Sequence, residues 1–310
     1  MSIAELSTVN LYFSPVLSDF KNAFQRPNHA HVQLIIINVV VFLVMAVFFV
    51  FSTVSGGEAF FKIIHDQFSI PPKVEDFITR PWTLVTYGFA HSITDIFHIL
   101  FNMLGLYWFG RLFNEYLGSD KLVATYLLGV LAGGILYLIM FNTIPYFVNQ
   151  SGFDGMVGAS AAVFAVMVAT ATLLPDYTFY LLLLGSVRIK YIALFYIVVS
   201  FIGTVGSNAG GNIAHLGGAM MGYVYIKQLQ AGVNWGGWIT ATLDWFKGLF
   251  SSKPKVKVTY RKTESAPKTA ATKGKASQEE IDRILDKISD RGYESLTKDE
   301  KEKLFNASKK

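Results

Sequence analysis

The sequence has 310 residues, of which 52% are hydrophobic and only 16% are charged. Soluble domains carry about 25% charged residues, so this composition favours a membrane protein. The absence of cysteine excludes a disulfide framework and a thiolate metal site. The net charge of +5 gathers in the C-terminal part of the chain, so it indicates membrane topology rather than nucleic-acid binding.

Six apolar stretches follow an N-terminal tail of residues 1–32, and a membrane-spanning helix needs roughly 20 mostly apolar residues. They lie at 33–52, 93–112, 122–141, 158–174, 191–206 and 212–229. The first lacks the small-residue cleavage site of a signal peptide, so we expect it to be retained. The pattern predicts an all-α fold, a polytopic membrane protein whose six-transmembrane-helix bundle occupies 33–230.

The orientation follows from Lys and Arg residues in the short loops. Arg111 and Lys121 flank the turn between the second and third spans, and Arg188 and Lys190 lie between the fourth and fifth. The loops 142–157 and 207–211 contain neither residue type. We therefore expect a multi-pass protein of the cell (inner) membrane with its N- and C-termini in the cytoplasm.

The segment between the first two spans is too long for a simple turn. Its stretch 58-EAFFKIIHDQFSI-70 places Phe60, Phe61, Ile64 and Phe68 near one face of a helix. This pattern predicts an interfacial element in the outer leaflet, and a partly ordered loop is the alternative.

Three segments of different character follow the sixth span. Residues 231–252 contain Trp235, Trp238 and Trp245, which indicates an amphipathic helix on the membrane surface. Residues 253–276 hold eight Lys or Arg against one Glu, and we expect a basic disordered linker.

Residues 277–310 contain two capping-box patterns, Ser277 with Glu280 and Thr297 with Glu300. Apolar residues at helical spacing follow each pattern, and Gly292 separates them. The segment predicts a small C-terminal helical hairpin, whose binding partner the sequence does not identify.

Four polar residues fall at one depth within the spans. His98 and Asn102 lie early in the second span, Ser160 early in the fourth and His215 early in the sixth. These three spans run in the same direction, so all four side chains should lie in the outer part of the membrane. Polar groups there usually face the bundle interior or a wet cavity.

Small residues should bring the fourth and sixth spans together. Gly218 and Gly222 form a GxxxG spacing, and the fourth span offers Gly158 and several alanines. Close packing of these two spans would bring Ser160 near His215.

A serine beside a histidine is the minimum for nucleophilic acyl chemistry, with His215 taking and later returning the proton of Ser160. Asn102, His98 and the Ser160 backbone N–H could donate to the oxyanion. Each residue alone has a plainer explanation, because serine is common in membrane helices and a lone histidine often only bonds a neighbouring helix. No metal or cofactor is implied.

At these residues the chain resembles the rhomboid intramembrane serine proteases, over about residues 80–230. The resemblance rests on three motifs in family order: 98-HILFN-102, 158-GASA-161 and 214-AHLGGAMMG-222. It implies a Ser160–His215 dyad, an oxyanion site at His98 and Asn102, and cleavage of transmembrane protein substrates in the lipid bilayer near its outer face. The hairpin resembles an appendage of some bacterial rhomboid-like proteins.

The chain departs from the family pattern at several positions. Ala161 stands where the family usually has glycine after the serine, Asn114 stands in place of a glutamate, and 80-RPW-82 replaces the usual Trp-Arg pair. The first departure keeps open a second hypothesis, a catalytically inactive rhomboid-like protein that binds membrane segments. A small transporter or channel is a third, since a polar cluster at one depth would also fit it.

Overall fold

The computed structural model describes residues 29–149, 155–181, 185–250 and 278–308. Most of the predicted N-terminal tail and the whole basic linker 253–276 lie outside these residues. The chain divides into two compact units, Met1–Ser252 and Lys253–Lys310.

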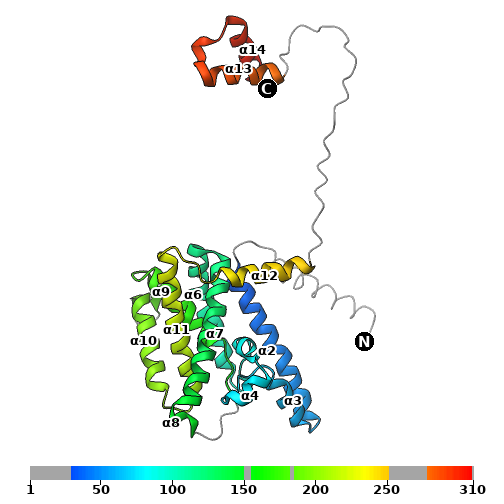
Figure 1. The fold of residues 1–310 in the computed structure, drawn as a ribbon, viewed down its shortest axis with the longest axis vertical. Helices are drawn as coiled ribbons and strands as arrows, with labels where there is room; N and C mark the ends of the chain where they lie inside the picture. The colour runs from blue at the N-terminus through cyan, green and yellow to red at the C-terminus, as the bar shows by residue number, and fades with distance from the viewer. Residues whose placement is uncertain (1–28, 150–154, 182–184, 251–277, 309–310) are drawn as a thin grey trace, which may run out of the picture. The chain divides into compact units, whose positions relative to one another are not determined.

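Long helices packed side by side make up the first unit (Figure 1). Within the described residues, three helices are long and apolar enough to cross a membrane, and the helices α9 and α10 are apolar but shorter. The predicted all-α membrane bundle is therefore confirmed. Its principal helices are α2 (Ala30–Val54), α6 (Ile96–Leu117), α7 (Ser119–Thr143), α9 (Ser160–Leu173), α10 (Ile189–Gly203) and α11 (Ala209–Gln230).

Helix α9 is short and lies in the middle of the bundle. Its 14 residues extend roughly 21 Å at 1.5 Å per residue, less than the roughly 30 Å of a hydrocarbon core. Residues 161–171 are all buried. Because the helix begins only at Ser160, the chain before it is non-helical, and such backbone is tolerated at membrane depth where protein or a wet cavity surrounds it.

That preceding chain is held by backbone hydrogen bonds. Met156 pairs with Ile70 in an isolated bridge, and the Gly158 N–H donates to the Tyr87 carbonyl at 2.9 Å. Tyr87 belongs to the short helix η1 (Tyr87–Phe89), which itself lies against α7 through a hydrogen bond from the Tyr87 hydroxyl to the Val130 carbonyl, 2.6 Å. The entry to α9 is thus fixed from two directions.

Glycines allow α11 to approach α9 and α7 at backbone distance. A Cβ on Gly218 would overlap the Ala161 carbonyl oxygen, and one on Gly222 would overlap that of Ala165. A Cβ on Gly217 would lie 2.8 Å from the Ala132 carbonyl oxygen on α7. The predicted close packing of the fourth and sixth spans is confirmed, and glycine is required at these positions.

The segment between α2 and α6 folds into short helices, α3 (Glu58–His65), α4 (Val74–Thr79) and α5 (Thr83–Thr86). Phe60 and Phe61 of α3 contact Phe48 and Phe49 of α2 through their rings. The helix predicted around 58–70 is therefore present but ends at His65, and its position in the outer leaflet stays a prediction.

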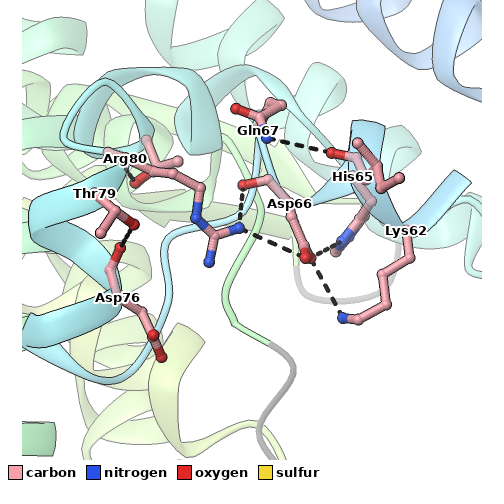
Figure 2. Close-up of polar contacts among 9 residues, drawn as sticks. Lys62, His65, Asp66, Gln67, Asp76, Thr79 and Arg80 are labelled. Atoms are coloured by element: carbon pink, nitrogen blue, oxygen red, sulfur yellow. Dashed lines mark hydrogen bonds and ion pairs between the residues drawn. The ribbon is translucent and has the colours of Figure 1, made fainter. Parts of the chain in front are cut away.

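Asp66 joins this loop together, as Figure 2 shows. Its carboxylate lies 3.6 Å from Arg80 Nη1 and 3.4 Å from Lys62 Nζ, and Arg80 also donates to the Asp66 carbonyl at 2.9 Å. Arg80 is the arginine of 80-RPW-82 and follows the last residue of α4, so it holds the end of α3 close to the end of α4.

The connection between α9 and α10 contains a small hairpin that the sequence analysis missed. Strands β1 (Thr178–Leu181) and β2 (Gly185–Arg188) pair antiparallel, with Phe179 opposite Val187. Helix α10 then begins at Ile189, so Lys190, expected in the loop, lies in its first turn. Lys190 binds Asp176 at 2.7 Å, and this contact lowers the pKa of the Asp176 carboxyl.

Helix α12 (Gly237–Phe250) follows α11 within the first unit. Ile239 is buried beside Ala124 and Leu128 of α7, whereas Trp238 and Trp245 are exposed. This helix lies where an interfacial segment was expected at 231–252, and its placement on a membrane surface stays a prediction.

The second unit contains α13 (Gln278–Arg291), the short helix η2 (Tyr293–Ser295) and α14 (Lys298–Ser308). Gly292 ends α13 with a φ of 74°, as expected. The Thr297 capping box is confirmed: the Thr297 N–H donates to Glu300 Oε2 at 2.7 Å, and the Glu300 N–H donates to Thr297 Oγ1 at 3.3 Å. Ser277 of the other predicted box lies outside the described residues.

Candidate active site

A cavity of about 1020 Å³ opens between α6, α9, α10 and α11. Its wall includes all four polar residues that the sequence analysis placed at one depth, namely His98, Asn102, Ser160 and His215. These four residues come from three helices, α6, α9 and α11. The remaining wall is mostly aromatic and aliphatic, including Phe101, Trp108 and Phe195.

Ser160 is the first residue of α9, so its backbone N–H has no partner within the helix. Gly158, two residues earlier, has a φ of 145°, a backbone conformation that residues other than glycine rarely adopt. A Cβ there would lie 2.9 Å from His98 Nε2 and 3.4 Å from Ser160 Oγ. Glycine at 158 therefore lets the Ser160 hydroxyl and the His98 ring face the same small space.

His98 and Asn102 project from consecutive turns of α6, which Asp95 caps by accepting from the Phe97 and His98 N–H groups. Asn102 is 7% exposed, and its Nδ2 has no hydrogen-bond partner among the residues that the structure describes. An unpaired buried donor costs free energy. A hydrogen bond from this amide to an oxygen atom that enters the cavity would therefore be stabilising.

His215 is held by two neighbours. Its ring stacks on Phe164 of α9, with centroids 4.2 Å apart and planes 12° from parallel. Its Nδ1 lies 3.1 Å from the hydroxyl of Ser200 on α10. Among the described residues Ser160 and His215 share the cavity wall but form no hydrogen bond with each other. Such contacts are often long in a site without substrate.

Comparison with known proteins shows to which family the part of the chain around this cavity is similar. Residues 79–230 match the family model described as the rhomboid domain. This part of the chain belongs to the rhomboid family. Residues 271–310 separately match a family of unknown function (DUF6576), which covers the C-terminal hairpin.

Two curated proteins are similar to the part of the chain that holds the rhomboid domain. RHOMBOID-like protein 12, mitochondrial, of Arabidopsis thaliana is 35% identical over 162 residues, which are 49% of this chain and 48% of that protein. Rhomboid protein 1, mitochondrial, of Saccharomyces cerevisiae is 26% identical over 160 residues, 49% of this chain and 42% of that protein. The chain spans less than half the length of these relatives.

Ala161, the departure from the family motif, does not face the cavity of the rhomboid domain. It is 1% exposed, and its methyl group points at Gly133 of α7, where an added Cβ would approach it to 2.6 Å. The missing side chain at Gly133 makes room for the extra methyl. The alanine is therefore accommodated within the helix packing, away from the cavity wall.

Two contacts of His215 in the rhomboid domain were not predicted from the sequence. Phe164 lies one helical turn after Ser160, so a search of the i+4 position would have found it. Ser200 carries no comparable signal, because its nearness to His215 depends on how α10 is rotated against α11. The ring of His91 lies 5.2 Å from that of His98, a contact that the sequence analysis did not predict.

Proposed function

We propose that this protein is an intramembrane serine endopeptidase, with Ser160 as nucleophile and His215 as general base. The observation that carries the proposal is the convergence of Ser160, His215, His98 and Asn102 on one cavity from three helices. The unpaired Asn102 amide adds to it, because a site that must stabilise a developing oxyanion needs donors free of other partners.

In this mechanism the imidazole of His215 accepts the proton of Ser160 Oγ as the oxygen attacks a peptide carbonyl carbon. The carbonyl oxygen becomes an oxyanion and accepts hydrogen bonds from Asn102, His98 and the Ser160 N–H. His215 then gives its proton to the leaving amine as the C–N bond breaks. Water, deprotonated by His215, then attacks the acyl carbon, and His215 returns the proton to Ser160 Oγ as the C–Oγ bond breaks.

The substrates in this proposal are transmembrane segments that reach the cavity from the lipid bilayer. The cavity wall combines a few polar residues with large apolar ones, which suits an extended peptide entering from an apolar environment. Cleavage then occurs near the outer membrane face, in a segment that unwinds before reaching Ser160.

A catalytically inactive protein that binds membrane segments is the second candidate. The observation that favours it is the absence, within the described part of the chain, of a hydrogen bond between Ser160 and His215. The buried position of the Ala161 methyl weighs against it, because the methyl leaves the cavity unobstructed.

A fluorophosphonate probe tests the proposal on the full-length protein purified in detergent. We expect wild type to be labelled, and Ser160→Ala and His215→Ala to be unlabelled. Ser186→Ala, which removes an exposed hydroxyl from β2, is the matched control and should label like wild type. A folded wild type that resists labelling would favour the inactive, segment-binding protein.

We also propose a cell (inner) membrane location with both termini in the cytoplasm. The chain has no cysteine, so single introduced cysteines report topology without background. In intact cells an impermeant maleimide should label Lys73→Cys and leave Lys298→Cys unlabelled until the membrane is opened. The reverse pattern would invert the proposed topology.

A further inference from the structure

Ser200 is the polar member of the buried face of α10. The helix buries only Ile189, Ala193 and Ser200, and apolar side chains such as Phe195, Phe201 and Ile202 are exposed along the rest of it. Ser200 is 2% exposed and does not line the cavity. Its hydroxyl therefore cannot touch a substrate held beside Ser160.

The Ser200 hydroxyl bonds a histidine instead of its own helix. Hydroxyls in membrane helices commonly donate to the carbonyl four residues earlier. Thr170 and Thr172 of α9 do so, at 2.6 Å and 2.7 Å. Ser200 Oγ instead lies 3.1 Å from His215 Nδ1, across the contact between α10 and α11.

The direction of this hydrogen bond decides whether His215 can act as a general base. A neutral imidazole carries a proton on one ring nitrogen and a lone pair on the other. If Ser200 accepts from Nδ1–H, the lone pair lies on Nε2, the nitrogen that Ser200 leaves available. If Ser200 donates to Nδ1 instead, Nε2 carries the proton and cannot accept one from Ser160.

The stacking partner restricts the ring in a second way. Phe164 lies parallel to the imidazole at 4.2 Å, so rotation about the Cβ–Cγ bond of His215 would break the stack. Ser200 fixes one edge of the ring and Phe164 fixes its plane. Together, Ser200 and Phe164 restrict the ring to one orientation. Ser160, His215 and Ser200 then correspond to a nucleophile, a general base and a third group that orients the base.

We propose that Ser200 is a positioning residue that accepts a hydrogen bond from His215 Nδ1–H and so presents an unprotonated Nε2 toward Ser160. The catalytic part of this inference rests on the proposed function. A hydroxyl takes the place that a carboxylate holds in many serine hydrolases. When His215 gains the proton of Ser160, the same bond becomes charge-assisted and stabilises the imidazolium.

The tautomer can be measured without any proteolysis. Solid-state ¹⁵N spectra of histidine-labelled protein in lipid distinguish protonated from unprotonated ring nitrogens, and the His215→Ala variant identifies the His215 signals. We expect wild type to show protonated Nδ1 and unprotonated Nε2, and Ser200→Ala to show both tautomers. A wild type with protonated Nε2, or a Ser200→Ala spectrum identical to that of wild type, would overturn the proposal.

The rate of fluorophosphonate labelling tests the consequence for Ser160. Ser200→Ala should lower the saturating labelling rate roughly tenfold, the size expected from losing one neutral hydrogen bond, with unchanged probe affinity. Ser200→Thr keeps the hydroxyl and should label within about threefold of wild type, whereas Ser186→Ala should not differ from it.

The two measurements separate two kinds of failure. If wild type is not labelled at all, the protease proposal fails, and the ¹⁵N spectra still decide whether Ser200 sets the tautomer. If wild type is labelled and Ser200→Ala is labelled equally fast while remaining folded, the positioning role is overturned and the protease proposal stands.

Discussion

The contact between α9 and α11, here called the glycine seam, and the C-terminal hairpin of α13 and α14 are stabilised in opposite ways. The glycine seam has no charged residue at its contacts, and Gly218 and Gly222 let the two backbones meet. Among its described residues, 278–308, the C-terminal hairpin buries only Ile284 and Leu296, and it adds ion pairs such as Lys287 with Glu300, 3.0 Å.

This difference shows where precision is needed in the chain. The glycine seam sets the separation of the helices that carry Ser160 and His215, and close packing tolerates no added atom. The C-terminal hairpin is held by exposed groups that water and salt weaken. Conditions that loosen the hairpin should therefore leave the seam intact, and substitutions that force the seam apart should leave the hairpin intact.

The largest effect should come from Gly218→Val, which places a branched side chain against the Ala161 carbonyl. We expect a loss in the free energy of unfolding of about 3 kcal/mol, together with loss of Ser160 labelling. Thermal unfolding in detergent measures it. Gly248→Val is the matched control, because among the described residues no neighbouring segment lies within 4 Å of the Cβ position at Gly248 on α12. Equal effects of the two substitutions would contradict the packing argument.

Ala161→Gly should have a smaller effect on the same seam. Removing the methyl loses its contact at Gly133, and glycine inside a helix costs about 1 kcal/mol relative to alanine. We expect about this loss in unfolding free energy and a labelling rate close to that of wild type. A large rise in the rate would show instead that Ala161 restrains the nucleophile.

As the pH falls, the stability of the C-terminal hairpin should decrease before that of the glycine seam does. The Thr297 N–H, followed by Lys287, lowers the pKa of the Glu300 carboxyl to about 2. Because an unfolded glutamate titrates near about 4.3, the stabilisation from Glu300 is complete above that pH and is lost as the pH falls through about 2. Amide NMR signals of α14 in the full-length protein should disperse less between pH 5 and pH 2.

Glu300→Gln should remove most of this pH dependence, since a neutral amide cannot titrate. Glu302→Gln, at an exposed position of the same helix, should retain it. A hairpin whose spectrum is unchanged from pH 5 to pH 2 in wild type would contradict the assignment of its stability to Glu300.

Salt should produce the smallest change. At 1 M ionic strength the Debye length is about 3 Å, so exposed pairs such as Lys301 with Glu294 and Lys303 with Asp299 are screened. Amide exchange in α14 should increase about fivefold or less, with no change in the unfolding temperature of the membrane bundle. An equal change in both regions would contradict the view that ion pairs stabilise the hairpin and close packing stabilises the membrane bundle.

Several parts of the candidate site were predictable because they depend on local spacing. His98 and Asn102 are four residues apart, so a helix places both on one face. The GxxxG spacing of Gly218 and Gly222 predicted close helix contact for the same reason. The hairpin of β1 and β2 was missed, since each strand has only four residues, too few for periodicity to separate a strand from a loop or a helix end.

By itself, the sequence determined the membrane class, the main helices, the glycine seam and the Thr297 capping box, all of which follow from the composition or from residues within a few positions of one another. Only the tertiary structure decided that Ser200 lies against His215 Nδ1, that the Ala161 methyl points at Gly133, and that Ser160 begins its helix beside a cavity. The physical reason is that these contacts depend on the rotation and depth of whole helices. Those quantities arise from the sum of many packing contacts across the bundle, and no local pattern encodes them.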